Sequence, residues 1–203
     1  MLLLIGHAGK KFWDVFQSRI ADEVMLKPDP VDRYSRDITA EALEKHLPNI
    51  NKWLLFPADD CPINLMALGR AFNWHTPSPL GMGIHWNYGL WSAYRAVWWV
   101  DVECEGQVSE SQVKSPATDI CSQCETQECV ASCPADAIQY RENPDLSSCA
   151  DYRLQDSSQC ESTCLARMAC PYAGEHRYIE QQMAYHYELS RSSIADYRRE
   201  KQQ

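Results

Sequence analysis

The chain has 203 residues, of which 45% are hydrophobic and 23% are charged. These proportions are ordinary for a folded globular protein and exclude wholesale disorder. The formal net charge of −9 argues against a nucleic acid as the main partner, because phosphate binding needs a broad basic surface.

The N-terminal hundred residues alternate between apolar runs of strand length and helical patterns, which predicts an α+β core. The run Leu2–Ile5 predicts a first strand; it is too short for a signal peptide, and no segment approaches the roughly 18 apolar residues that span a bilayer. We therefore expect a cytoplasmic protein with no membrane partner. The further elements predicted in this part are helices over 12–20, over 30–47 with Asp29 as N-cap, and over 62–72, and strands over 53–56 and 93–103.

Two stretches interrupt this alternation. Residues 75–89 are rich in proline and glycine and predict a long loop, a kind of loop that is often functional. Residues 105–118 shift to Gly, Ser, Gln, Lys and Pro, which indicates a domain boundary. Near the C-terminus we expect a helix over 177–189 and a separate last helix capped by Ser192 or Ser193.

The cysteines carry the clearest chemical signal. The chain has ten, and eight of them fall between Cys121 and Cys170. A cytosolic protein keeps its thiols reduced, so this density predicts metal binding rather than a disulfide framework. Cys61 and Cys104 stand apart from the others, and isolated cysteines are usually small buried hydrophobic residues.

The eight clustered cysteines form two runs that each end in Cys-Pro. The first run reads CSQCETQECVASCP and the second reads CADYRLQDSSQCESTCLARMACP. Bacterial ferredoxins bind two 4Fe–4S clusters with C-x2-C-x2-C-x3-C-P, in which the fourth cysteine ligates the other cluster. Here two extra residues separate Cys124 from Cys129 and two more precede Cys170, and the second run is spread out, so the loops are wider than in that motif.

Two 4Fe–4S clusters are the interpretation that the spacing favours. A pair of four-thiolate zinc sites is the alternative, although zinc prefers C-x2-C pairs in two separated halves. If the ferredoxin crossing pattern holds, each cluster takes three thiolates from one run and a fourth from the other. One cluster would then be held by Cys121, Cys124, Cys129 and Cys170, and the other by Cys133, Cys149, Cys160 and Cys164.

The segments on either side of the cysteines resemble a known family. The stretch GIHWNYGLWSAYRAV, residues 83–97, is similar to the H-P-x-F-G-G-W-F-A-x-R-G-V signature of CblC-type cobalamin-processing proteins. The opening LLLIGHAGKKFWDVF with KPDPVDRYS, and the later RYIEQQMAY, resemble further segments of that family in the same order. The chain departs from the signature at Trp86, where the family has proline, and at Leu90, where it has glycine.

The resemblance implies a nitroreductase-like mixed sheet with flanking helices, into which a bacterial-ferredoxin-like segment is inserted. Epoxyqueuosine reductases and reductive dehalogenases are similar in joining such a core to two clusters. The implied division is a core over 1–114, a cluster segment over 115–174, and C-terminal helices of the core over 175–203.

The function that the resemblance implies is electron transfer from two 4Fe–4S clusters to a bound corrinoid, for reductive cobalamin processing or cobalamin-dependent reduction by an oxidoreductase. An electron donor protein would be a further partner. The residues that the resemblance places beside cobalamin are His85, Tyr88, Gly89 and Trp91. Two alternatives stay open, a plain two-cluster ferredoxin and a flavin-binding iron–sulfur reductase.

Overall fold

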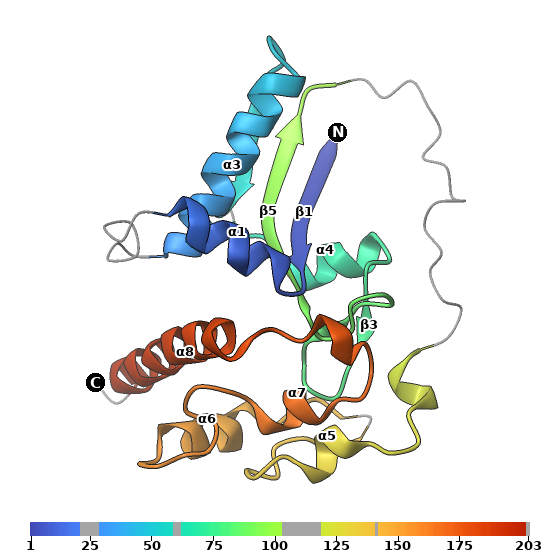
Figure 1. The fold of residues 1–203 in the computed structure, drawn as a ribbon, viewed down its shortest axis with the longest axis vertical. Helices are drawn as coiled ribbons and strands as arrows, with labels where there is room; N and C mark the ends of the chain where they lie inside the picture. The colour runs from blue at the N-terminus through green and yellow to red at the C-terminus, as the bar shows by residue number, and fades with distance from the viewer. Residues whose placement is uncertain (21–28, 59–61, 103–118, 141, 202–203) are drawn as a thin grey trace. The chain divides into compact units, whose positions relative to one another are not determined.

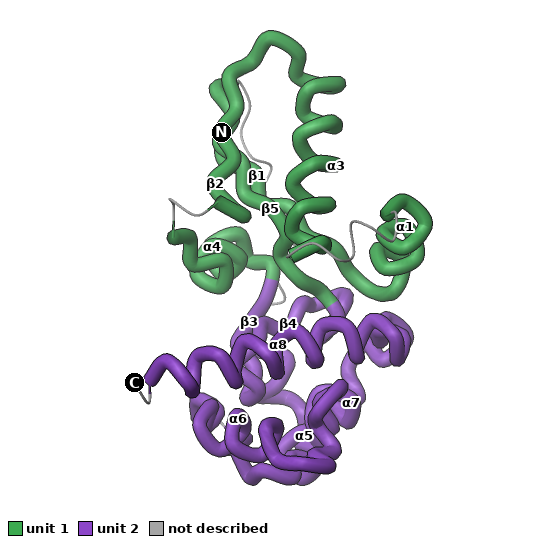
Figure 2. The backbone as a smooth tube through the Cα atoms, turned by 90° about the vertical axis from the view of Figure 1, so that its left-hand side faces the viewer, with its two compact units in different colours: residues 1–74, 92–115 green, residues 75–91, 116–203 purple. Residues whose placement is uncertain are grey.

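The computed structural model describes residues 1–20, 29–58, 62–102, 119–140 and 142–201 (Figure 1). The protein is mixed α+β, as the alternation of patterns predicts. Its chain forms two compact units, one of residues 1–74 and 92–115 and the other of residues 75–91 and 116–203 (Figure 2). None of the helices in the described ranges has the length and apolar character needed to cross a membrane.

This grouping differs from the three-part division predicted from the sequence. Residues 75–91 and the C-terminal helix belong with the cysteine segment, not with the N-terminal unit. The physical reason is that the cysteine segment has few large apolar side chains of its own, so Leu90 packs on Cys170 and Trp91 packs on Met183. The predicted boundary over 105–118 lies outside the described residues.

The first unit contains a three-stranded antiparallel sheet. The strands are β1 (Leu2–Ala8), β2 (Lys52–Phe56) and β5 (Ser92–Val100), in the order β1-β5-β2. All three are predicted from their apolar runs, and their ends differ from the prediction by at most three residues. A bulge between Ile5 and Gly6 shifts the register of β1 against β5.

Three helices accompany this sheet, α1 (Lys11–Arg19), α3 (Pro30–His46) and α4 (Leu65–Ala71). Helix α3 packs on β5, where Leu43 meets alternate strand residues Ala96, Trp98 and Val100 in a buried cluster. Asp29 occupies the N-cap position of α3 as predicted, but its side chain makes no capping hydrogen bond. The helix ends two residues before Pro48.

The second unit is built from short elements around one long helix (Figure 1). A two-stranded ribbon joins β3 (Thr76–Pro77) and β4 (Gly83–Ile84). The helical elements are η2 (Cys121–Gln123), α5 (Glu128–Ala131), α6 (Leu146–Leu154), α7 (Leu165–Ala169), η3 (Gly174–His176) and α8 (Glu180–Lys201).

The prediction of two separate C-terminal helices is wrong, because α8 runs without a break from Glu180 to Lys201. Ser192 and Ser193 do not cap a new helix. Their hydroxyls donate to the carbonyl oxygens of Glu188 and Leu189, one turn earlier in the same helix. This local bond lets a serine remain inside a helix. A serine in the sequence therefore does not by itself tell a helix interior from an N-cap.

Candidate metal centres

Short helical turns position the clustered cysteines of the second unit. The Asp119 carboxylate accepts a hydrogen bond from the backbone N–H of Cys121 at 3.1 Å and so fixes the turn at which η2 begins. Asp145 caps α6, which carries Cys149, by accepting from the backbone N–H groups of Ser147 and Ser148. Cys129 lies in the short helix α5, and cap positions of short helical elements hold Cys124, Cys164 and Cys170.

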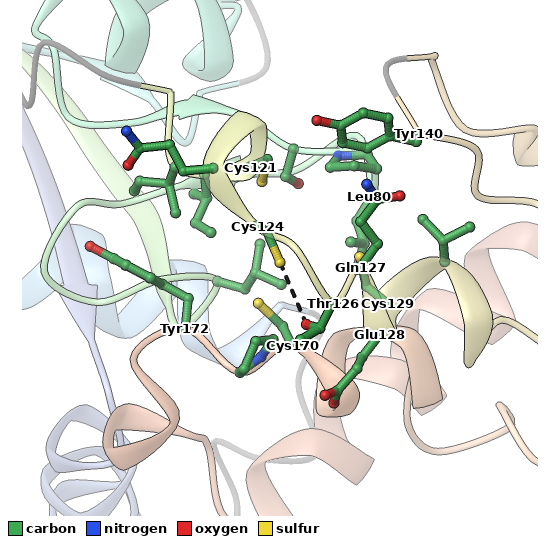
Figure 3. Close-up of a pocket in the computed structure, with 18 of the residues that line it drawn as sticks. Leu80, Cys121, Cys124, Thr126, Gln127, Glu128, Cys129, Tyr140, Cys170 and Tyr172 are labelled. Carbon is green, nitrogen blue, oxygen red and sulfur yellow. Dashed lines mark hydrogen bonds between the residues drawn. The ribbon is translucent and has the colours of Figure 1, made fainter.

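Four thiols line a first cavity of about 590 Å³. They belong to Cys121, Cys124, Cys129 and Cys170. Leu80, Ile84 and Leu90 supply apolar wall, and Leu90 and Ile84 form a buried cluster with Cys170 itself. Figure 3 shows Cys124 and Cys170 side by side, with Thr126 hydroxyl 3.7 Å from the Cys124 sulfur. The loop over residues 75–91 therefore forms part of this site.

The other four thiols line a second cavity of about 270 Å³. They belong to Cys133, Cys149, Cys160 and Cys164. Small apolar residues such as Ala137 and Ala166 complete its wall, together with Tyr187 from α8. The Cys164 sulfur accepts a hydrogen bond from the backbone N–H of Arg167 at 3.4 Å.

The thiols whose charges shift one another's pKa values fall into the same two sets. Burial, followed by the charges of Asp119 and Cys170, raises the pKa of Cys121 to about 12. Burial and then the neighbouring Cys164 raise the pKa of Cys149. Thiols grouped this closely resist ionisation together, so a cation has to compensate before all four act as thiolates.

The grouping of the eight cysteines is the one that the ferredoxin crossing pattern predicts: three thiols of one run meet the last thiol of the other at each cavity. Within the described ranges, no three His, Cys, Asp or Glu side chains converge tightly enough to hold a single metal ion. The thiols stand around open space instead. Four thiols on an apolar-walled cavity fit the donor set of a 4Fe–4S cluster.

His85 and Tyr88, two of the residues that the family resemblance singles out, lie together in a tight turn. The ring of His85 lies 4.9 Å from that of Tyr88, and its Nδ1 accepts from the backbone N–H of Asn87 at 3.0 Å. Burial, and then the nearby His75, lower the pKa of His85, so the imidazole is neutral at neutral pH. Its Nε2 makes no hydrogen bond to the described residues.

Gly89 and Trp91 have structural positions. Gly89 pairs with His85 and adopts a left-handed backbone with φ of +57°, which closes the turn. Trp91 has no exposed surface and packs against Tyr178 and Met183. The indole lines neither thiol cavity, and the place of Trp91 beside cobalamin stays a prediction.

Sequence reasoning missed two arginines at the second cavity. Arg153 and Arg167 line it, and each has only 7% of its surface exposed. Arginine is usually an exposed residue, so nothing in its pattern along α6 and α7 indicates burial. The only sign of these arginines in the sequence is their spacing, four residues after Cys149 and three after Cys164.

Comparison of the chain with protein-family models, curated proteins and solved structures finds no match. The two thiol cavities and the residues around them are therefore the features from which a function can be inferred. Cys61 and Cys104, the two isolated cysteines, lie outside the described residues.

Proposed function

We propose that this protein transfers electrons through two 4Fe–4S clusters, one in each thiol cavity. The observation that carries the proposal is the sorting of eight cysteines into two sets of four, with one cysteine of each run crossing to the other set. That sorting reproduces the wiring of bacterial two-cluster ferredoxins. It does so despite wider spacing, with four residues between Cys124 and Cys129 and ten between Cys149 and Cys160, where the ferredoxin motif has two at each place.

The cavities also favour a cluster over a zinc ion. Four thiolates that bind one zinc approach it to about 2.3 Å and fill the space between them. Here each set of four thiols lines, together with neighbouring residues, a cavity of about 590 or 270 Å³. Space of this kind suits a cubane of iron and sulfide, in which each thiolate binds a different iron.

Bound clusters of this type supply one-electron transfer. The chain contributes the ligands and their surroundings. Leu80, Ile84 and Leu90 shield the first set of thiols from water. At the second set, the Arg167 N–H donates to the Cys164 sulfur, and such a bond favours negative charge on sulfur. Both effects tune how readily a bound cluster accepts an electron.

We further propose a corrinoid as the electron acceptor, bound by a nitroreductase-like, CblC-type core. The support is the family resemblance of residues 83–97 together with the placement of His85, whose Nε2 has no partner among the described residues. The same loop contributes Ile84 and Leu90 to the wall of the first thiol cavity. An electron acceptor beside His85 would thus lie on the loop that covers one cluster.

Metal and sulfide analysis of anaerobically prepared protein tests the cluster proposal. We expect about eight irons and about eight sulfides per chain, and a brown colour that bleaches on reduction. Stoichiometric zinc without sulfide would contradict the proposal.

Titration with cobalamin tests the acceptor separately. Binding should shift the corrinoid spectrum of the wild type, and His85→Ala should weaken that shift while the iron content stays unchanged. A spectrum unaltered at tens of micromolar cobalamin rules out binding stronger than about −6 to −7 kcal/mol. A plain two-cluster carrier, or a flavin detected by its own absorption, would then remain.

A further inference from the structure

The two thiol cavities differ sharply in charge. The described residues that line the second cavity include Arg153 and Arg167 and no Asp or Glu. Those that line the first include Glu125 and Glu128 and no Lys or Arg. Because an electron added to a cluster is a negative charge, this difference acts directly on the ease of reduction.

Arg153 is fixed at the second cavity by several hydrogen bonds. Its Nε donates to the carbonyl oxygen of Cys160 at 3.3 Å, and its two terminal nitrogens donate to Ser190 Oγ and to the carbonyl oxygen of Tyr187. The guanidinium also lies 5.0 Å from the centre of the Tyr187 ring. Because the groups that bind this buried guanidinium are neutral, none of them cancels its positive charge at the site.

Arg167, which also lines the second cavity, is held in a similar way. It donates to the carbonyl oxygen of Leu90 at 2.6 Å and lies over the rings of Trp91 and Tyr178, at 4.7 and 4.9 Å from their centres. Neither guanidinium appears in an ion pair with a carboxylate in the described residues. No carboxylate of the described residues therefore pairs with either charge.

The charges at the first cavity are weaker in effect. Glu125 and Glu128 are exposed, so water screens them. Arg177 lies near this site too, since it donates to the carbonyl oxygen of Cys170 at 3.1 Å, and it offsets part of their negative charge. The asymmetry between the sites thus comes mainly from the two buried arginines of the second.

We infer that Arg153 and Arg167 raise the reduction potential of the cluster at Cys133, Cys149, Cys160 and Cys164 above that of its neighbour, an inference that rests on the proposed function. The first electron to enter the chain resides at this second site. The cluster under the loop of His85 is the stronger reductant and passes an electron on only when both clusters are reduced. Arg153 and Arg167 act on the cluster through their positive charge, and they touch no substrate.

A potentiometric titration of the iron-loaded full chain, followed by EPR at about pH 8, measures both potentials. We expect two separate one-electron steps, at least tenfold apart in their reduction equilibria, or about 59 mV. A single step in a loaded wild type overturns the inference. Absence of iron and sulfide overturns the proposed function instead.

Variants assign the steps to the sites. Arg153→Gln should lower the upper potential by at least tenfold in equilibrium, about 59 mV, and leave the lower one in place. Arg153→Lys keeps the charge and should leave both potentials near the wild-type values. Arg198→Gln is the matched control, because Arg198 is held at the surface by Asp151 and Ser147 and lines neither thiol cavity.

If Arg153→Gln does not hold both clusters, Arg167→Gln is measured in its place with the same expected shift. A shift in the lower step alone, equal shifts in both steps, or no shift in either would overturn the assignment. If the replacement of Arg153 acted only through folding, it would reduce the iron content. The reduction potentials of the molecules that still hold both clusters would then stay unchanged.

Discussion

Trp91→Ala should destabilise the cysteine unit rather than disturb a corrinoid alone. The indole is fully buried, meets Tyr178 edge-to-face at 5.5 Å between ring centres, and lies under the guanidinium of Arg167. Truncation of a buried tryptophan to alanine costs about 3–5 kcal/mol. The loss here includes the aromatic surface over which the Arg167 guanidinium lies.

Urea unfolding of the anaerobic, iron-loaded protein, followed by far-UV circular dichroism, measures this effect. With a slope of about 2 kcal/mol per molar, a loss of about 4 kcal/mol moves the midpoint down by about 2 M. Trp99→Ala is the control, since Trp99 is 45% exposed on β5 of the other unit, and its midpoint should change much less. A Trp91→Ala protein with a wild-type midpoint and an altered cobalamin spectrum would refute the reasoning.

Two further predictions concern the turn closed by Gly89 and the N-terminus of α6 at Asp145. Gly89→Ala should lower the urea midpoint and the iron content, because a Cβ there meets the Tyr172 carbonyl oxygen at 2.8 Å and a left-handed backbone costs about 1 kcal/mol more. Gly174→Ala, whose Cβ has its nearest neighbours at 3.6 Å, should leave both values unchanged; equal effects of the two changes would contradict this account. Asp145→Ala should lower the midpoint by less than Trp91→Ala does, because α6 loses its cap, and Asp145→Asn should retain most of the stability since its amide oxygen still accepts from Ser147 and Ser148. An Asn variant as unstable as the Ala variant would show that the carboxylate charge, and not the cap, matters.

The features that sequence predicts well are those fixed by local spacing. The strands over 2–8, 52–56 and 92–100 follow from short apolar runs, and the α3 helix follows from Pro30 at its first turn. The sorting of the cysteines also follows from spacing, because a run that wraps one site and ends in proline sends its last thiol elsewhere.

The features that sequence misses depend on tertiary packing. Trp91 follows a Gly-rich loop, and its complete burial with Tyr178 and Met183, residues far along the chain, has no local signature. Arg153 and Arg167 acquire their role only when α6, α7 and α8 enclose the second cavity. Likewise the grouping of residues 75–91 with the cysteines arises from packing of Ile84 and Leu90 on Cys170, which has no local signature.

In the proposed arrangement, each cysteine run donates its last ligand to the cluster of the other run. Native mass spectrometry of anaerobically prepared wild type and of two double variants, Cys121→Ala with Cys170→Ala and Cys121→Ala with Cys133→Ala, tests this arrangement directly by the number of intact four-iron clusters per chain. We expect two clusters in the wild type, one when Cys121 and Cys170 are replaced together and none when Cys121 and Cys133 are replaced together, since Cys121 and Cys170 line one cavity and Cys133 lines the other. The reverse result, one cluster without Cys121 and Cys133 and none without Cys121 and Cys170, would show that each run holds its own cluster and would contradict the crossing.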